Sequence, residues 1–266
     1  MIWLEGIPPF TGVAARFAIA ALVVGALARR RGVRFGGRPY ERRLWWINGL
    51  LSFATSYAVV YWAEQWVPSG LTAMLFATFP LFVAILAPMT LPGERLGARG
   101  IAGTVLGFVG VAVIFSEDFA LLGGREVAIA SAVMLISPIV SAVANVAVKR
   151  WGAGIPPFSI TAVPMAIGAA VAAVLALTFE RDLPVTLDLR SVSALLYLAI
   201  AGSAVTFSLY YWLLRNLAAT RLSLITYGIP VVAVFLGTVF LDEPLTARMV
   251  AGGALVLFGV GFALRR

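Results

Sequence analysis

One charged residue, Arg16, lies well inside an apolar run of this sequence, and it is the first candidate for binding chemistry. An unpaired charge at membrane depth is costly, so its side chain should face protein or water. Asn145 is a second polar residue within an apolar segment. The alternatives left open are that Arg16 extends to the nearer membrane surface, and that Asn145 only bonds a neighbouring helix.

Aromatic residues with hydroxyl groups form a second set of candidates. Tyr57 and Tyr61 are four residues apart and therefore share one face of a helix. A cage of aromatic rings with hydroxyl tips suits amphipathic or apolar solutes. A belt at the membrane interface is the alternative, and we expect it for Trp45, Trp46 and Trp66. The cavity candidates are Tyr57, Tyr61, Trp62, Tyr211 and Tyr227.

Two prolines, Pro80 and Pro230, lie deep within apolar segments. Proline removes a backbone hydrogen bond and clashes with the preceding turn of a helix. In lipid, the freed carbonyl needs another partner, such as a neighbouring helix or cavity water. Transporter sites lie beside broken helices of this kind, so both prolines are predicted to border a substrate site. A tolerated kink is the alternative.

The residue types that are missing limit the chemistry further. The sequence has no Cys and no His, which excludes thiolate nucleophiles, disulfides, histidine bases and the usual zinc ligand sets. No Gly-x-x-x-x-Gly-Lys motif is present, which argues against ATP hydrolysis by this chain. We therefore predict no catalytic residues, no cofactor and no metal.

The elements that position these candidates are membrane helices. The sequence is 61% hydrophobic and 12% charged, whereas soluble domains are about half apolar and about a quarter charged. A spanning helix needs roughly 20 apolar residues. The sequence thus predicts an all-α integral membrane protein. Its nine predicted spans are 9–28, 44–66, 69–91, 98–116, 127–148, 157–179, 192–214, 219–241 and 247–264.

The basic residues predict the orientation of these spans. Seven arginines lie between the first two spans, within 29–43. If this loop is cytoplasmic, the inner segments carry fifteen basic residues and the outer ones four. This asymmetry follows the positive-inside rule. We expect a multi-pass protein of the plasma membrane with a cytoplasmic C-terminus, and no binding of nucleic acid.

An internal repeat relates the two halves of the chain. The matching segments lie 148 to 150 residues apart: Gly6-Ile7-Pro8-Pro9-Phe10 with Gly154-Ile155-Pro156-Pro157-Phe158, Tyr61-Trp62 with Tyr211-Trp212, Pro80 with Pro230, and Gly110-Val111 with Gly259-Val260. The repeats are predicted to be 1–118 and 119–266. The second has five spans and the first has four, with residues 1–5 resembling the tail of a missing first helix. Two five-helix repeats insert in opposite orientations, as in many secondary transporters.

Glycines recur in the last span of each half. The segment Gly103-x-x-x-Gly107 fits the small-residue motif that lets two membrane helices approach closely. We expect a structural role in tight helix packing for these glycines, which are Gly100, Gly103, Gly107, Gly110, Gly252, Gly253, Gly259 and Gly261.

The order of three motifs resembles a known family. They are Pro9 to Ala15-Arg16-Phe17, Ala73 to Pro80 followed by Gly93-Glu94-Arg95, and Ala219 to Pro230 followed by Asp242-Glu243-Pro244-Leu245. Over almost the whole chain, the pattern is similar to the EamA family of the drug/metabolite transporter superfamily. The resemblance implies ten helices and the export of amino acids, their derivatives or other metabolites, often in exchange with a proton gradient. In this family the first helix, which this sequence lacks, lines the central cavity.

The leading functional prediction is a secondary transporter that exports small metabolites by alternating access. A non-catalytic membrane helper or channel is the first alternative. A lipid-acting membrane enzyme is the second, although the spans hold no paired carboxylates and no His. The predicted partners are a small-molecule substrate and the lipid bilayer, and a homodimer is left open.

Overall fold

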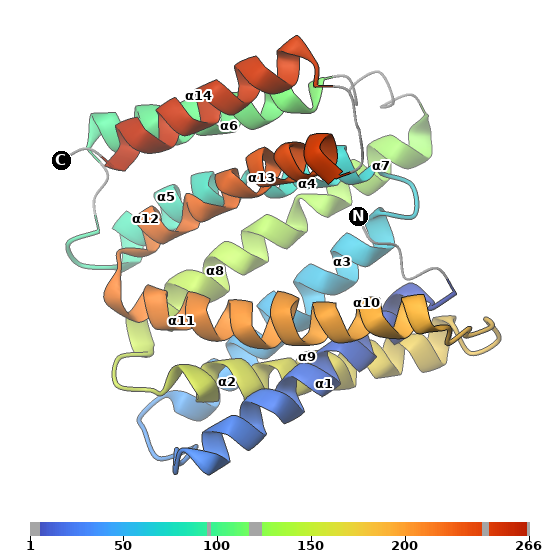
Figure 1. The fold of residues 1–266 in the computed structure, drawn as a ribbon. Helices are drawn as coiled ribbons and strands as arrows, with labels where there is room; N and C mark the ends of the chain where they lie inside the picture. The colour runs from blue at the N-terminus through green and yellow to red at the C-terminus, as the bar shows by residue number, and fades with distance from the viewer. Residues whose placement is uncertain (1–5, 95–96, 117–123, 241–244, 265–266) are drawn as a thin grey trace. The chain divides into compact units, whose positions relative to one another are not determined.

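A computed structural model describes residues 6–94, 97–116, 124–240 and 245–264. These residues form helices and connecting turns, with no β-strand among them (Figure 1). The elements are α1 (Pro9–Arg30), α2 (Glu41–Asn48), η1 (Gly49–Thr55), α3 (Ser56–Ala63), α4 (Ser69–Phe76), α5 (Phe79–Thr90), α6 (Ala98–Ile114), α7 (Arg125–Met134), α8 (Ile136–Trp151), α9 (Pro157–Phe179), α10 (Leu189–Ala199), η3 (Ile200–Val205), α11 (Thr206–Asn216), α12 (Ala219–Ser223), α13 (Ile225–Phe240) and α14 (Ala247–Leu264).

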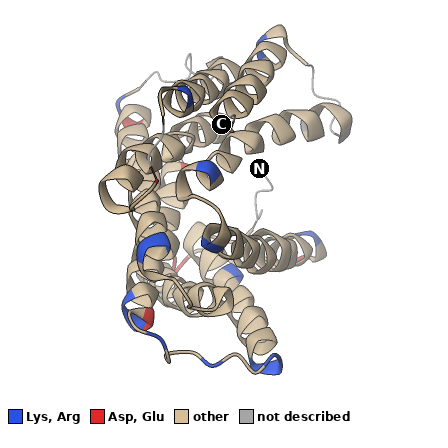
Figure 2. Cartoon of the chain, turned by 90° about the vertical axis from the view of Figure 1, so that its left-hand side faces the viewer, with Lys and Arg blue, Asp and Glu red and all other residues tan. Residues whose placement is uncertain are grey.

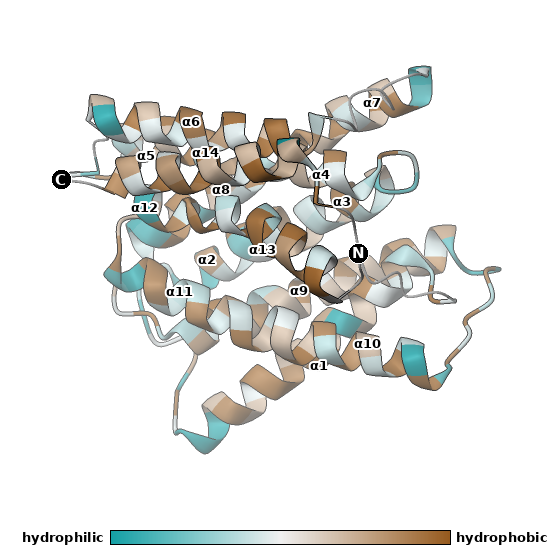
Figure 3. Ribbon diagram, turned by 45° about the horizontal axis from the view of Figure 1, so that its top comes forward, coloured by the Kyte–Doolittle hydropathy of each residue, from teal (hydrophilic) through white to brown (hydrophobic). Residues whose placement is uncertain are grey.

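Among the described residues, seven helical stretches are long and apolar enough to cross a membrane. Hydrophobic residues dominate along the helices, whereas hydrophilic ones gather at helix ends and in connections (Figure 3). The two other predicted spans appear as the interrupted series α2–η1–α3 and as the 17-residue α6. The prediction of an all-helical membrane fold is confirmed, whereas the number of nine spans stays a prediction. The predicted missing helix would precede residues 1–5, which lie outside the described residues.

The chain forms two compact units, and each combines helices from both halves of the sequence. The first unit is Met1–Trp62 with Ala147–Asn216, and the second is Ala63–Val146 with Leu217–Arg266. The predicted repeats, 1–118 and 119–266, are segments of sequence rather than compact units. Their boundary stays a prediction.

In the first unit, α1 packs along α9. These two helices are antiparallel, because Glu180, directly after α9, binds the backbone at the start of α1. The helix α10 and the segment η3 also contact α1, and η1 contacts α9. As a result of these contacts, polar side chains of the first unit lie in its interior.

Two π-helical segments, η1 and η3, interrupt the helices that hold most of the tyrosines. π-helical turns bond five residues back along the chain and are often found at functional sites. The segment η1 also comes very close to α9, since a Cβ added at Gly49 would lie 2.9 Å from the side chain of Ile167. The offset of about 150 residues that relates the two halves also relates η1 to η3.

In the second unit, α6 and α14 pack through their glycines. A Cβ added at Gly103 would lie 2.5 Å from the backbone nitrogen of Ala263. A Cβ added at Gly110 would lie 2.6 Å from the backbone nitrogen of Val256. The predicted role in close packing is confirmed for Gly103, Gly107, Gly110, Gly252 and Gly259, where a side chain has no room. It is wrong for Gly253 and Gly261, because a Cβ there would meet nothing within 4 Å.

The two predicted proline sites differ in the structure. Pro80 lies in the first turn of α5, after the break that separates α4 from α5. Proline is tolerated there because the first N–H groups of a helix have no partner within it. Pro230 lies inside α13, where it interrupts the backbone ladder.

Figure 2 shows the positions of the basic residues, and two of them in the first unit contact aromatic rings near the connection between α8 and α9. The guanidinium of Arg31 lies 5.6 Å from the ring centroid of Phe158, and that of Arg43 lies 5.5 Å from that of Trp151. These contacts join Arg31, directly after α1, to the start of α9, and Arg43 on α2 to the end of α8. The predicted orientation requires the basic segments to lie on the same side of the membrane, and these contacts agree with it.

Candidate functional site

Arg16 lies in the first half of α1, and its side chain is only 9% exposed. Its Nε donates to Ser203 Oγ at 2.7 Å, and its Nη2 donates to the Gly202 carbonyl at 3.2 Å. Its Nη1 donates to Tyr61 Oη at 3.4 Å. These acceptors are neutral, and within the described part of the chain no carboxylate forms an ion pair with Arg16. The charge is therefore held in place without being neutralised.

The segment η3 supplies two of these three acceptors. Gly202 and Ser203 both lie in η3, whose contact with α1 brings them to Arg16. The N–H groups of a π-helix reach back five residues, so the ladder shifts and leaves individual carbonyls for other donors. The Gly202 carbonyl, within η3, accepts a hydrogen bond from Arg16.

Aromatic rings line the other side of the guanidinium. The carbon Cζ of Arg16 lies 5.5 Å from the ring centroid of Tyr57 and 5.8 Å from that of Phe17. A cation within about 6 Å of a ring centroid is attracted to the ring face. Tyr57 also contacts Phe17 edge-on at 4.6 Å and stacks with Tyr61 at 6.3 Å, both between ring centroids. The site thus combines the positive charge of Arg16 with the apolar surface of the aromatic rings.

The aromatic row continues from Tyr57 through Phe207 to Tyr211. The ring centroids of Tyr57 and Phe207 are 6.4 Å apart, and those of Phe207 and Tyr211 are 6.3 Å apart. Tyr211 Oη donates to Asn48 Oδ1 at 3.0 Å, and Asn48 Nδ2 donates to the Ile160 carbonyl at 3.1 Å. The Tyr211 hydroxyl is therefore fixed by a buried amide. We name the set Arg16, Phe17, Tyr57, Tyr61, Gly202, Ser203, Phe207 and Tyr211 the arginine–aromatic cluster.

The structure brings four predicted site residues into this cluster: Arg16, Tyr57, Tyr61 and Tyr211. Trp62 also belongs to the first unit, on α3, and is partly exposed. The other predicted residues belong to the second unit, and they are Pro80, Asn145, Tyr227 and Pro230.

Tyr227 is fully buried against α6 in the second unit. Its hydroxyl donates to the Thr104 carbonyl at 3.0 Å, and its ring lies over Gly107. Asn145 is buried on α8. A role in substrate binding stays a prediction for both residues, as it does for the two prolines.

Five residues of this region were not predicted as site residues: Asn48, Gly202, Ser203, Phe207, and Phe17, which was noted only as part of the family motif. Phe207 lies four residues before Tyr211, so the helical spacing that joins Tyr57 to Tyr61 also contained a signal for it. Asn48, like Asn145, is an amide within an apolar span. Nothing local indicated Gly202 or Ser203, because their partner Arg16 lies 187 residues away from Ser203 in the sequence.

The model of the EamA-like transporter family matches residues 2–116 and 128–265 of the chain. The chain belongs to this family. It is similar to a "Probable terminal-alkyne amino-acid exporter" from Streptantibioticus cattleyicolor, with 28% identity over 94% of this chain and 82% of the relative. It is also similar to a "Probable amino-acid metabolite efflux pump" from Escherichia coli, with 26% identity over 79% of this chain and 72% of the relative.

A solved crystal structure shares the fold of this EamA-like transporter, with a TM-score of 0.87 at 22% identity. The match covers 98% of this chain and 88% of the solved one. Family and relatives are transporters rather than enzymes, which confirms the predicted class. With its several spanning helices, this EamA-like transporter is a multi-pass membrane protein that acts on small molecules.

Glu180 anchors the helix that carries Arg16 in this EamA-like transporter. Its buried carboxylate accepts from the backbone N–H groups of Phe10 at 2.7 Å and Thr11 at 2.8 Å, and from Thr11 Oγ1 at 2.8 Å. These N–H groups start α1, which has no side-chain cap of its own. A carboxylate also compensates the positive end of the helix. Glu180 therefore fixes the end of α1 nearest to Arg16.

Replacing Glu180 by alanine should destabilise the protein by roughly 1–3 kcal/mol, because buried N–H groups lose a charged acceptor. The midpoint of thermal unfolding in detergent should fall for Glu180→Ala. Asp182→Ala is the matched control, because Asp182 is an exposed carboxylate two residues further on. Equal midpoints for Glu180→Ala and Asp182→Ala would contradict the assignment of Glu180 as the cap of α1.

Proposed function

We propose that this transporter exports small metabolites that carry a carboxylate, such as amino acids or their derivatives, and that it works by alternating access. The observation that carries the proposal is the buried guanidinium of Arg16, which has neutral hydrogen-bond partners and aromatic neighbours. A buried cation that forms no ion pair with a carboxylate of the described residues favours binding of an anion. The substrate carboxylate supplies the missing charge.

The planar guanidinium can bind a carboxylate through two parallel hydrogen bonds. Ser203, Gly202 and Tyr61 accept hydrogen bonds from the group and hold it in place. The rings of Tyr57 and Phe207, which contact each other and are partly exposed, offer apolar surface for the rest of the substrate. Small-molecule sites commonly combine a largely apolar lining with a few oriented polar groups.

Two relatives support this class of substrate, since their names refer to amino-acid export and amino-acid metabolite efflux. Their identity to this chain is low, at 28% and 26%. The substrate assignment therefore depends mainly on Arg16 and its surroundings.

The arrangement of related helices supports an inverted repeat, and with it alternating access. The repeat offset relates α1 to α9 and α6 to α14, and each related pair packs together. The two π-helical segments are also related by this offset. A cytoplasmic C-terminus in the plasma membrane is the orientation that the clustered basic segments favour.

The substrate class can be tested in inverted membrane vesicles that contain the protein. The standard amino acids are offered in labelled form, and uptake is compared with that of vesicles without the protein. For each amino acid that is taken up, the unlabelled acid and its primary amide are added as competitors. We expect the acid to compete and the amide to fail, because the amide lacks the charge that pairs with Arg16. Equal competition by acid and amide would contradict a carboxylate at Arg16.

A further inference from the structure

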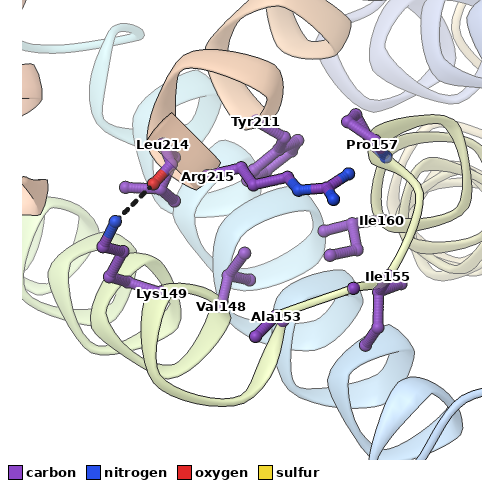
Figure 4. Close-up of a pocket in the computed structure, with 11 residues that line it drawn as sticks. Val148, Lys149, Ala153, Ile155, Pro157, Ile160, Tyr211, Leu214 and Arg215 are labelled. Carbon is purple, nitrogen blue, oxygen red and sulfur yellow. Dashed lines mark hydrogen bonds between the residues drawn. The ribbon is translucent and has the colours of Figure 1, made fainter. Parts of the chain in front are cut away.

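A second polar site lies at the basic end of the first unit, apart from the arginine–aromatic cluster except for the shared residue Tyr211. It is a pocket of about 260 Å³ (Figure 4). Its walls come from the end of α8, the connection 152–155, the start of α9 and the end of α11. The proposed function does not use this pocket.

Two cations line the pocket. Lys149 Nζ donates to the Leu214 carbonyl at 2.9 Å, which holds the ammonium against the end of α11. The Arg215 side chain extends across the pocket towards Pro157 (Figure 4). No acidic residue is among those that line the pocket. The start of α9 faces the same space and adds the positive end of a helix dipole. The C-terminal ends of α8 and α11 carry partial negative charge, which the full charges of Lys149 and Arg215 in their last turns outweigh. The pocket therefore favours an anion.

The surface of α11 beside the pocket indicates which kind of anion fits. Leu209 and Trp212 are 54% and 53% exposed, and they precede Arg215 at intervals of three residues. Residues three apart are neighbours on a helix surface, so these three follow one another obliquely along α11. An exposed apolar stripe thus ends at a cation of the pocket. This is the pattern that a phospholipid requires, with its acyl chain along the stripe and its phosphate at the cation.

We propose that this pocket binds the phosphate headgroup of an anionic phospholipid of the cytoplasmic leaflet. The phosphate oxygens accept hydrogen bonds from Lys149 and Arg215, and an acyl chain lies along Leu209 and Trp212. Basic pockets between helices on the cytoplasmic side suit anionic headgroups, and tryptophan favours the same membrane depth. Since the pocket is bordered by the ends of α8 and α11, the bound lipid also joins these helices at the membrane surface.

The test uses the purified full chain in neutral detergent, with bound lipid measured by native mass spectrometry. Phosphatidylglycerol should bind more tightly than phosphatidylcholine of the same chain length. Lys149→Gln with Arg215→Gln should weaken phosphatidylglycerol binding by about 30-fold, from the loss of two charges near the membrane surface. Arg150→Gln is the matched control, because the Arg150 guanidinium lies over the ring of Trp151 and does not line the pocket.

Three outcomes would overturn the proposal: equal binding of the two lipids, equal loss in Arg150→Gln, or no loss in the double variant. If the double variant does not fold, Arg215→Gln alone decides the question, because substitution of an exposed side chain usually changes stability little. A second arm adds glycerol 3-phosphate and inorganic phosphate. If either displaces phosphatidylglycerol at equal concentration, the site binds soluble phosphates and the lipid assignment is wrong.

Discussion

Replacing Arg16 by glutamine should reduce transport by about 100-fold or more, because the substrate carboxylate loses its buried counter-charge. The transport rate of Arg16→Lys should lie between that of Arg16→Gln and that of the unaltered protein. It keeps the charge but loses the planar fork that binds a carboxylate through two hydrogen bonds. Initial rates of uptake into inverted vesicles measure both effects, normalised to the amount of protein in the membrane.

The matched control is Arg29→Gln, which removes an exposed arginine from the last turn of the same helix. It should transport at nearly the rate of the unaltered protein. Equal rates in Arg16→Gln and Arg29→Gln would show that Arg16 has a structural role only, and the proposed site would then be wrong.

The second large effect is on stability, at the contact between α6 and α14. Gly259→Ala should destabilise the protein by roughly 1–3 kcal/mol, as expected for overpacking. The added Cβ would lie 2.5 Å from the backbone nitrogen of Gly107 and 2.8 Å from the carbonyl oxygen of Gly103. Backbone atoms cannot move aside as a flexible side chain can, so the helices must separate.

Gly253→Ala provides the control on the same helix, because a Cβ there would meet nothing within 4 Å. Alanine should leave the stability unchanged or raise it slightly, since glycine is unfavourable within a helix. Thermal unfolding in detergent gives the comparison. If Gly253→Ala and Gly259→Ala have equal midpoints of thermal unfolding, close packing of α14 on α6 does not determine stability.

Composition and hydrophobic length were sufficient to predict the fold class, because lipid requires long apolar helices whatever their packing. They could not indicate the π-helical turns in 44–66 and 192–214, which arise where η1 and η3 pack against α9 and α1. The close packing of Gly103 and Gly107 was predictable, because the motif is local.

Parts of the candidate site were predictable, either from one unusual residue, as with Arg16, or from spacing, as with Tyr57 and Tyr61. Arg16 stood out as a charge within an apolar run, but its partners Gly202 and Ser203 come from the other half of the chain. For Tyr227, by contrast, the sequence does not distinguish between two roles. A tyrosine deep in a span suits a cavity or a packed core equally well, and its contacts with Thr104 and Gly107 appear only in three dimensions.

The central claim is that the protein is a carrier that binds its substrate at Arg16, and counterflow in proteoliposomes tests it most directly. Liposomes that contain the purified protein are loaded with an unlabelled amino acid that it transports, and a trace of the labelled form is added outside. We predict transient accumulation of label above the outside concentration, with a rate that saturates, and no accumulation in liposomes with Arg16→Gln. Entry that rises in proportion to concentration without accumulation, or equal counterflow in Arg16→Gln, would contradict the claim.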